Sequence, residues 1–379
     1  MPARLNIVSR ESPDPPPVPM ADTRSGQWIR PAIQALIPYH VPESSGLIKL
    51  DAMENPYSWP EAIVGEWLQT LEAVPLNRYP DAEAGALKSG LRAYLSLSSA
   101  TGILLGNGSD ELIQMICLAV AGSGRTLLTP EPGFAMYRVI ATITGLNYVA
   151  VPLNPADFSL DMPAMLAAIE RHQPALVMFA YPTNPTGNLF DRNEVEQLIR
   201  ASPGLVVIDE AYFNFAGETF IYGLSRYPNV LVLRTLSKMG LAGLRLGILV
   251  GHHDWLSEIN KVRLPYNINV LSQISGEFIL RHAQILEAQI RRICVDREAL
   301  YRGLKKLDNI EIWPSRTNFL LMRLAGRADQ VFQGLKAAGI LIKNMNGTHP
   351  LLWDCMRVTI GTSTENRRFY EALKSLLKP

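Results

Sequence analysis

Short apolar runs alternate with amphipathic stretches from about residue 104 to residue 250, and this alternation constrains the fold more than any other feature. The runs expected to form strands are residues 126–129, 148–151, 176–181, 205–209, 230–234 and 246–250. Several are apolar on both faces, which is typical of parallel strands covered by helices on both sides. Residues 110–121, 135–144, 162–172 and 193–201 are expected to be helical. The pattern predicts an α/β domain with a mostly parallel sheet flanked by helices and right-handed crossovers.

Beyond residue 261 the pattern changes to that of a bridging helix and a second, smaller domain. Residues 273–307 form a long, charged, amphipathic stretch. The α+β unit after it is expected to have strands at 310–312, 319–324, 341–343 and 357–360, and helices at 330–338 and 365–377. The predicted organisation is a flexible Pro-rich arm (1–35), a segment contributing to the small domain and the active site (36–75), a large α/β domain (76–270), and the bridging helix with the small C-terminal α+β domain (271–379).

Composition excludes several classes of protein. The chain has 379 residues and a net charge of +1, which gives no reason to expect a nucleic-acid partner. Its cysteines, Cys117, Cys294 and Cys355, are widely spaced and form no CxxC pair, so neither a metal site nor a disulfide framework is expected. No apolar run is long enough to span a bilayer, and the N-terminus lacks the apolar core of a secretory signal. We therefore expect a cytoplasmic protein from a reducing compartment, without a membrane partner.

Lys238 is the strongest candidate for a catalytic residue. It follows the apolar run 230–233, is preceded by Ser237, and is followed seven residues later by Arg245. An amine in this position suits a site that binds a phosphorylated aldehyde, because the amine can react with the carbonyl carbon while the hydroxyl and the guanidinium bind the phosphate. The alternative for this residue alone is a solvated loop lysine.

Three further polar motifs fall where predicted strands end, the place where ligands collect in an open parallel sheet. Residues 106–111 open a helix with glycines, and the free N–H groups of that helix can cradle a phosphate, although an ordinary helix cap has the same pattern. Asn184 lies between two prolines in what could also be a rigid turn. Asp209 ends a buried strand, where a carboxylate can pair with a protonated ring nitrogen, bind a metal or cap a helix; Tyr212 could then bond the ring's phenolic oxygen.

Taken together and in this order, the motifs resemble those of the class I/II pyridoxal-phosphate-dependent aminotransferases of fold type I and, within them, the histidinol-phosphate aminotransferase group. The resemblance extends from about residue 38 to residue 377. The motifs that carry it are residues 51–56, 77–80, 106–111, 184–187, 209–212, 235–238, 244–247, 316–319 and 356–361.

The resemblance implies a role for each site residue. Lys238 would hold the aldehyde of pyridoxal 5'-phosphate covalently and move a proton, with Asp209 at the ring nitrogen, Asn184 and Tyr212 at the 3′-oxygen, and Phe134 stacked on the ring. The phosphate would be bound by Gly108, Ser109, Asp110, Ser237 and Arg245, and by Tyr79 from a neighbouring subunit, which implies a homodimer. Substrate contacts would come from Arg357, Lys343, Asn55 and Tyr39. No metal is implied.

The chain departs from the family pattern in two places. The loop at residues 239–243 is one residue shorter than the common form. Lys343 stands where many members have a second arginine for the substrate phosphate. Lysine keeps the positive charge but lacks the bidentate fork of a guanidinium.

The expected reaction is a two-stage transamination between the small molecules glutamate and imidazole-acetol phosphate, a step of histidine biosynthesis. An aromatic amino-acid aminotransferase is the nearest alternative, and a threonine-phosphate decarboxylase of cobalamin synthesis is another. A regulator that kept the fold and lost the chemistry is a fourth possibility. It would be expected to carry an appended DNA-binding motif or to have lost Lys238 or Asp209, and the sequence has neither feature.

Overall fold

The computed structural model describes residues 24–378 and has two compact units, Met1–His40 and Val41–Pro379. The Pro-rich run at residues 11–19, predicted to be a flexible arm, lies outside the described residues. In the first unit, α1 (Arg24–Trp28) precedes the short helix α2 (Pro31–Gln34), which begins with a proline at its first position. The Gln34 amide donates to the carbonyl of Gly26 at 2.9 Å and to that of Ile29 at 2.6 Å, which fastens the two helices together.

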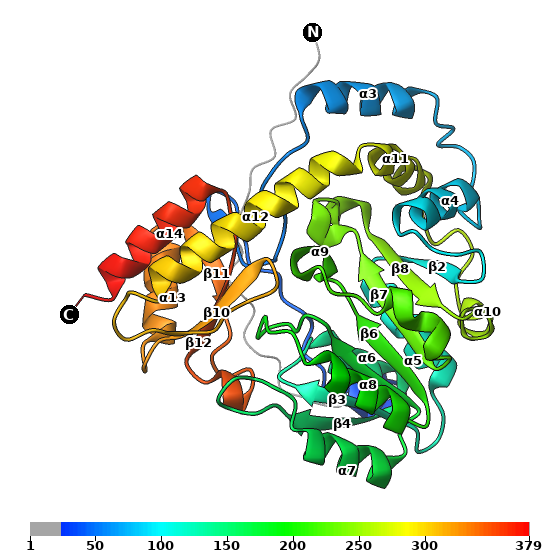
Figure 1. The fold of residues 1–379 in the computed structure, drawn as a ribbon, viewed down its shortest axis with the longest axis horizontal. Helices are drawn as coiled ribbons and strands as arrows, with labels where there is room; N and C mark the ends of the chain where they lie inside the picture. The colour runs from blue at the N-terminus through cyan, green and yellow to red at the C-terminus, as the bar shows by residue number, and fades with distance from the viewer. Residues whose placement is uncertain (1–23, 379) are drawn as a thin grey trace. The chain divides into compact units, whose positions relative to one another are not determined.

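The second unit is built on a seven-stranded sheet with the strand order β2-β8-β7-β6-β5-β3-β4 (Figure 1). The strands are β2 (Gly102–Asn107), β3 (Thr126–Glu131), β4 (Asn147–Pro152), β5 (Leu176–Ala180), β6 (Leu205–Asp209), β7 (Val230–Thr235) and β8 (Leu246–Gly251). Strand β8 runs antiparallel to both of its neighbours, β2 and β7, and the other pairs are parallel. The mostly parallel sheet predicted from the sequence is confirmed.

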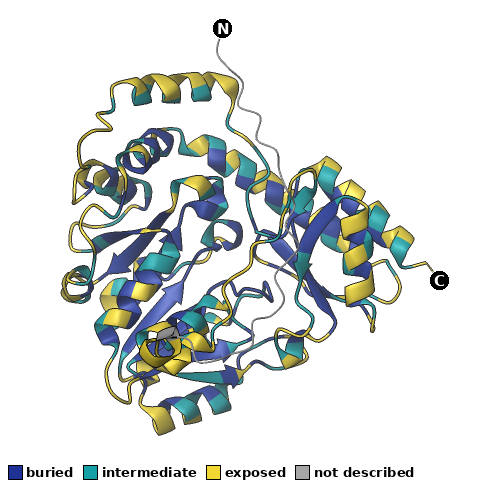
Figure 2. Ribbon diagram, turned by 180° about the vertical axis from the view of Figure 1, so that it is seen from behind, coloured by how far each residue is buried: buried dark blue, intermediate teal, exposed yellow. Residues whose placement is uncertain are grey.

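Both faces of this sheet are buried, because alternate residues of each strand pack into two different apolar clusters (Figure 2). In β6, for example, Leu205 and Val207 join one cluster and Val206 and Ile208 join the other. The first cluster is covered by α5 (Ser109–Val120), α6 (Met136–Thr144) and α10 (His253–Asn260). The second is covered by α4 (Gly85–Tyr94), α7 (Met162–His172), α8 (Arg192–Ala201) and α11 (Val270–Arg281). Each fully buried branched side chain contributes roughly 1.5–3 kcal/mol, so the two-sided burial fixes the sheet firmly.

The small domain contains a five-stranded sheet with the order β1-β11-β12-β10-β9. Its strands are β1 (Ile48–Leu50), β9 (Glu311–Ile312), β10 (Phe319–Arg323), β11 (Ile340–Asn344) and β12 (Cys355–Thr359), with the helices α13 (Ala328–Ala337) and α14 (Ser363–Leu376). Strand β1 comes from the N-terminal side of the chain and pairs in parallel with β11. The small domain is therefore assembled from both ends of the second unit.

The predicted bridging helix is divided into two helices, which corrects the expectation of one continuous stretch. Helix α11 ends and α12 (Ala283–Leu304) begins at His282, whose backbone angles of φ −115° and ψ 24° are not helical. The break has no proline or glycine to mark it. It arises because α11 packs on α3 (Glu61–Glu72) and α4, whereas α12 packs on α14 and on α9 (Phe213–Ala216), and it is α12 that runs toward the small domain (Figure 1).

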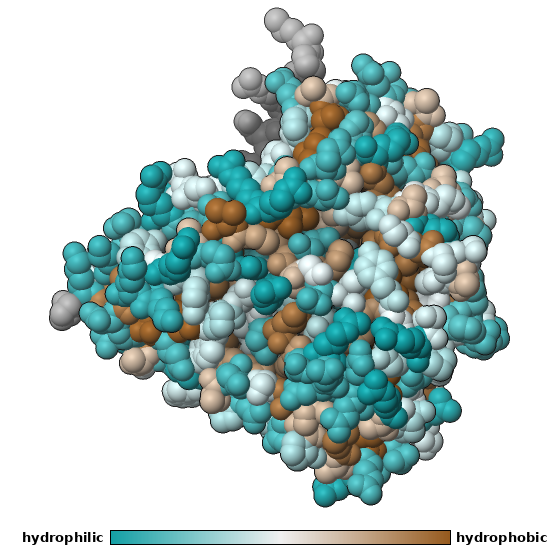
Figure 3. Space-filling model, viewed as in Figure 1, coloured by the Kyte–Doolittle hydropathy of each residue, from teal (hydrophilic) through white to brown (hydrophobic). Residues whose placement is uncertain are grey.

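Two observations describe the surface. Among residues 24–378, no helix is both long and apolar enough to cross a bilayer. On the face drawn in Figure 3, apolar side chains lie in small patches among polar ones.

Candidate active site

The predicted site motifs gather at one edge of the large sheet, because β2, β5, β6 and β7 all have their carboxyl ends there. Asp209 is the last residue of β6, and Asn184 lies in the turn after β5. Lys238 lies in a 3₁₀ turn, η2 (Ser237–Met239), directly after β7. The strand β2 leads through Gly108 into α5.

The Asp209 carboxylate is buried with a hydrogen-bond donor on each oxygen. The hydroxyl of Tyr137 donates to Oδ2 at 2.7 Å, and the backbone N–H of Ala211 donates to Oδ1 at 3.0 Å. Burial raises the pKa of Asp209 to about 6, and the Tyr137 hydrogen bond opposes that rise. Within residues 24–378, no Lys, Arg or His side chain forms an ion pair with this carboxylate, so it is suited to receive a positively charged group from a ligand.

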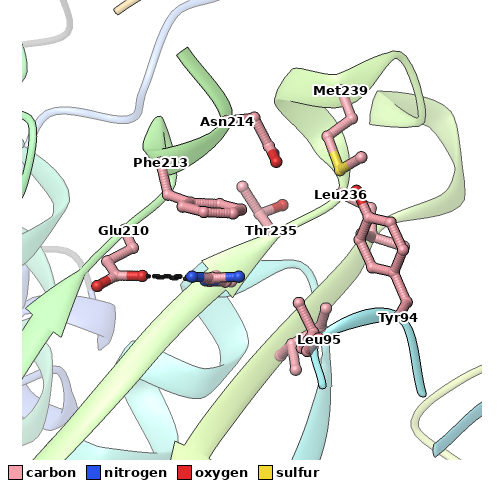
Figure 4. Close-up of a pocket in the computed structure, with 10 residues that line it drawn as sticks. Tyr94, Leu95, Glu210, Phe213, Asn214, Thr235, Leu236 and Met239 are labelled. Atoms are coloured by element: carbon pink, nitrogen blue, oxygen red, sulfur yellow. Dashed lines mark hydrogen bonds and ion pairs between the residues drawn. The ribbon is translucent and has the colours of Figure 1, made fainter. Parts of the chain in front are cut away.

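The next residue, Glu210, is engaged in a separate ion pair. Its carboxylate accepts two hydrogen bonds from Arg234, at 3.0 and 2.8 Å, and one from the Thr219 hydroxyl at 2.8 Å. Glu210 and Arg234 line a small pocket together with Thr235, at the end of β7, and Met239, the last residue of the turn that contains Lys238. Figure 4 labels Glu210, Thr235 and Met239 around this pocket. Arg234 therefore pairs with Glu210, the residue that follows Asp209.

A chain of hydrogen bonds joins Asn184, Tyr212 and Arg357, all of them buried. The Asn184 amide nitrogen lies 3.2 Å from the Tyr212 hydroxyl, and its oxygen accepts from the Arg357 guanidinium at 2.5 Å. Arg357 also donates to the backbone carbonyl of Asp51 at 3.0 Å. The structure thus brings a small-domain arginine directly to the large-domain pair predicted to bind the cofactor oxygen.

Lys238 is half-buried beside this chain of hydrogen bonds. Its Nζ donates to the carbonyl of Ala52 at 3.2 Å. Burial, together with the positive charge of Arg357, lowers the pKa of Lys238 to about 8. An appreciable fraction of the amine is therefore neutral, and so nucleophilic, near neutral pH.

The start of α5 carries the motif predicted to bind a phosphate. Gly108 has φ +80°, and the helix begins at Ser109 with no side-chain cap on its first N–H groups. A Cβ at Gly108 would lie 2.4 Å from the Arg245 guanidinium, and one at Gly247 would lie 2.5 Å from the Gly108 backbone. The Arg245 guanidinium lies 3.5 Å from the Asp110 carboxylate. Free N–H groups beside a cation, with room only for glycine, suit an anion of the size of a phosphate.

The other predicted residues occupy more varied positions. Ser237 is buried, with its hydroxyl 2.9 Å from that of Thr235, and Phe134 contacts the edge of the Tyr137 ring at 5.5 Å between centroids. Lys343 lies directly opposite Arg357 in the β11–β12 pair. Tyr79 is 80 % exposed and stacks on Tyr266. Tyr39 belongs to the first compact unit, and its substrate contact stays a prediction. The Asn55 amide nitrogen donates hydrogen bonds to Met239 and Gln289.

Sequence reasoning missed Tyr137, the partner of Asp209. It is 72 residues away in the chain, on α6, and no local pattern links the two. In the part of the chain that the structure describes, no group of three His, Cys, Asp or Glu side chains is placed to bind a metal ion.

Comparison with known proteins identifies the family. Residues 45–373 match the model for aminotransferases of class I and II. The chain belongs to the class I and II aminotransferase family. It is 54 % identical to histidinol-phosphate aminotransferase 2 of Nitrosococcus oceani, over 94 % of this chain and 99 % of that protein. It is 49 % identical to histidinol-phosphate aminotransferase of Chromobacterium violaceum, over 92 % and 97 % of the two chains.

A solved aminotransferase structure has the same fold. Histidinol-phosphate aminotransferase from Sinorhizobium meliloti, in complex with pyridoxal-5'-phosphate, superposes with a TM-score of 0.83 at 26 % identity, over 94 % of this chain and 99 % of that one. The fold type I expected from the sequence is confirmed. The buried carboxylate, the lysine of lowered pKa and the glycine cradle described above fit the ring nitrogen, the aldehyde and the phosphate of that cofactor.

The lowered pKa of Lys238 leads to a testable pH dependence in the cofactor-free protein. Only the neutral amine attacks an aldehyde, so we expect labelling of Lys238 by a small aldehyde and cyanoborohydride to rise about tenfold from pH 6 to pH 7 and to level off above about pH 8. Peptide mass spectrometry measures the labelling at this position. A rate that keeps rising tenfold per pH unit toward pH 10 would contradict the lowered pKa.

Proposed function

We propose that this aminotransferase exchanges an amino group between glutamate and imidazole-acetol phosphate, forming histidinol phosphate in histidine biosynthesis. The names of the curated relatives, at 44–54 % identity over almost the whole chain, support this substrate. The reaction needs pyridoxal 5'-phosphate. When bound, this cofactor supplies an aldehyde that takes up the amino group and a ring that accepts electrons from the substrate α-carbon.

Each catalytic group of the chain has a defined task in this proposal. Asp209 would balance a positive charge at the ring nitrogen of the cofactor, and Asn184 and Tyr212 would bond its 3′-oxygen. Lys238 carries a proton between the substrate and the cofactor, for which a pKa of about 8 is well matched to neutral pH. Gly108, Ser109 and Arg245 would bind the phosphate, with Asp110 and Ser237 beside it, and Phe134 would cover one face of the ring.

The observation that carries the choice of substrate is the pairing of Lys343 with Arg357. They are directly opposed residues of the antiparallel strands β11 and β12, so their side chains lie on the same face of the small-domain sheet. Two cations on that face suit a dianionic phosphate better than a single carboxylate. Arg357 alone would also suit a simple carboxylate, which keeps an aromatic amino acid as the second candidate.

The test compares two amino donors. Purified enzyme with pyridoxal phosphate and 2-oxoglutarate is offered histidinol phosphate or phenylalanine, and glutamate formation is measured. We expect kcat/KM to favour histidinol phosphate by about two orders of magnitude or more, since loss of a charged group's partners costs on the order of 1.5–3 kcal/mol for each hydrogen bond. A preference for phenylalanine would overturn the substrate while leaving the chemistry. Release of carbon dioxide from threonine phosphate would favour a decarboxylase.

Substitution of Lys343 tests the phosphate pair directly. We expect Lys343→Gln to raise the KM for histidinol phosphate about tenfold with little change in kcat, because one charged hydrogen bond to the phosphate is lost. Lys343→Arg should keep the KM near or below the wild-type value. The control is Lys336→Gln, which removes the same charge from an exposed position on α13. Equal effects of the two Gln variants would exclude a specific phosphate contact.

We propose further that the enzyme is a cytoplasmic homodimer in which Tyr79 reaches the cofactor phosphate of the partner subunit. The exposure of Tyr79, its stacking on Tyr266 with ring centroids 4.4 Å apart, and the exposed Leu76 and Leu264 support an apolar surface for a second copy. The three free cysteines fit a reducing compartment. The division of the chain at residues 35, 75 and 270 is part of the same proposal.

A further inference from the structure

The segment of residues 51–58, part of the connection from β1 to α3, contacts two basic side chains of the site. The carbonyl of Ala52 accepts from Lys238, and the carbonyl of Asp51 accepts from Arg357. This segment therefore contacts both Lys238 and Arg357 through its backbone.

Both N–H groups of the Asn55 amide in this segment are used within the chain. Its nitrogen donates to the carbonyl of Met239 at 2.9 Å and to Oε1 of Gln289 at 2.8 Å, which accounts for both of its N–H groups. Its oxygen accepts from the backbone N–H of Tyr57 at 2.9 Å. A substrate could receive a hydrogen bond from this nitrogen only if one of the two internal bonds broke.

The partner of Asn55 is the turn that carries Lys238. Met239 and Gly240 are the next two residues, and Gly240 has φ +119°. A Cβ at Gly240 would lie 2.9 Å from the Asn55 nitrogen, so glycine gives both the backbone conformation and the space for the amide to approach. The amide thus holds the turn at its C-terminal side, while β7 holds it at the other.

Gln289 orients the Asn55 amide from the bridging helix α12. Its own nitrogen donates to the carbonyl of Ser58 at 2.9 Å, so the glutamine contacts the 51–58 segment at two points. Three parts of the chain, the segment before α3, the turn after β7 and the N-terminal third of α12, meet at this one amide.

We propose that Asn55 is a positioning residue for Lys238 and does not bind the substrate. With Gln289, it fixes the turn at residues 237–240 and so keeps the Lys238 amine in place while that amine moves a proton. The inference rests on the proposed function, because it concerns the same lysine. It replaces the substrate contact that the sequence resemblance implied for Asn55.

The experiment separates the two roles by their effect on kcat and KM. We expect Asn55→Ala and Asn55→Asp to lower kcat about 10- to 100-fold, since misplacement of a reacting group by about 1 Å costs on the order of 10²-fold, with KM for both substrates within about twofold of wild type. Gln289→Ala should have a smaller effect of the same kind. The double variant Asn55→Ala/Gln289→Ala should lose little more than Asn55→Ala alone. Gln284→Ala, an exposed glutamine on the same helix, is the control.

A second measurement does not depend on turnover. In the cofactor-loaded enzyme without substrate, we expect the backbone amides of residues 237–241 to exchange hydrogen about tenfold faster in Asn55→Ala and Gln289→Ala than in wild type. A raised KM with unchanged kcat would restore Asn55 as a substrate contact, and unchanged exchange would overturn the positioning role. If no amino donor is turned over at all, the proposed function fails, whereas the exchange measurement still decides the role of Asn55.

Discussion

Replacement of Lys238 by alanine is expected to lower kcat by at least about four orders of magnitude, because the variant has no amine to hold the cofactor or to move the proton. The absorbance of the covalently held cofactor should disappear at the same time. Steady-state kinetics and absorption spectra of the purified variant measure the two effects. Lys238→Arg should be nearly as inactive, since a guanidinium stays protonated and cannot act as a base.

The same variant should lose activity but not stability. Burial lowers the pKa of Lys238, so holding the protonated amine in the folded protein is unfavourable at neutral pH. We therefore expect the Tm of cofactor-free Lys238→Ala to equal or exceed that of cofactor-free wild type. Lys261→Ala, at an exposed position near the large sheet, should change neither activity nor the spectrum. Wild-type turnover by Lys238→Ala would contradict the catalytic role.

The large domain could be predicted from the sequence because its strands are buried on both faces. Residues 205–209 are continuously apolar up to a single aspartate, and the observed strand β6 has those two ends. The same pattern places Asp209 at the carboxyl edge without any knowledge of its neighbours. Strand ends elsewhere differ by one or two residues, since backbone pairing extends beyond the apolar run, as in β3, which continues to Glu131.

The division of the bridging stretch into α11 and α12 could not be predicted, because residues 273–307 keep a helical amphipathic pattern throughout. The break at His282 is imposed by tertiary packing, since the two helices lie against different partners. A periodic pattern indicates that a segment is helical but does not indicate which surface each part of the segment will cover.

Long-range side-chain pairing limited the prediction of the site in the same way. Motifs at strand ends identified Lys238, Asn184 and Asp209 because the topology alone brings these positions together. The hydrogen bond from Tyr137 to Asp209 depends on the packing of α6 against the sheet, and the bonds from Asn55 depend on the position of α12. Such contacts have no signature in the local sequence.

Asp209→Asn is expected to be the second most damaging substitution, with kcat lowered about 10³-fold. The amide has the shape of the carboxylate, so its oxygen can accept from the Ala211 N–H and its nitrogen can donate to the Tyr137 hydroxyl, but it cannot balance a positive charge at the cofactor ring. In the cofactor-free protein the change should not reduce Tm. Burial raises the pKa of Asp209 to about 6, so above that pH the folded protein holds an ionised carboxylate that burial disfavours.

Tyr137→Phe is expected to have a smaller effect than Asp209→Asn, because it keeps the carboxylate and removes one of its hydrogen bonds. The lost hydrogen bond stabilised the ionised carboxylate, so the pKa of Asp209 should rise further. The kcat/KM of the variant should fall about tenfold relative to wild type, and the loss should be larger at pH 6 than at pH 8. Tyr148→Phe is the matched control, because it removes a hydrogen bond of 2.5 Å to the Glu131 carboxylate and leaves Asp209 unchanged. The pH profile of kcat/KM measures the effect. Identical pH profiles for the two Phe variants would show that Tyr137 acts only through packing. Full activity of Asp209→Asn would show that no charge is needed at this position.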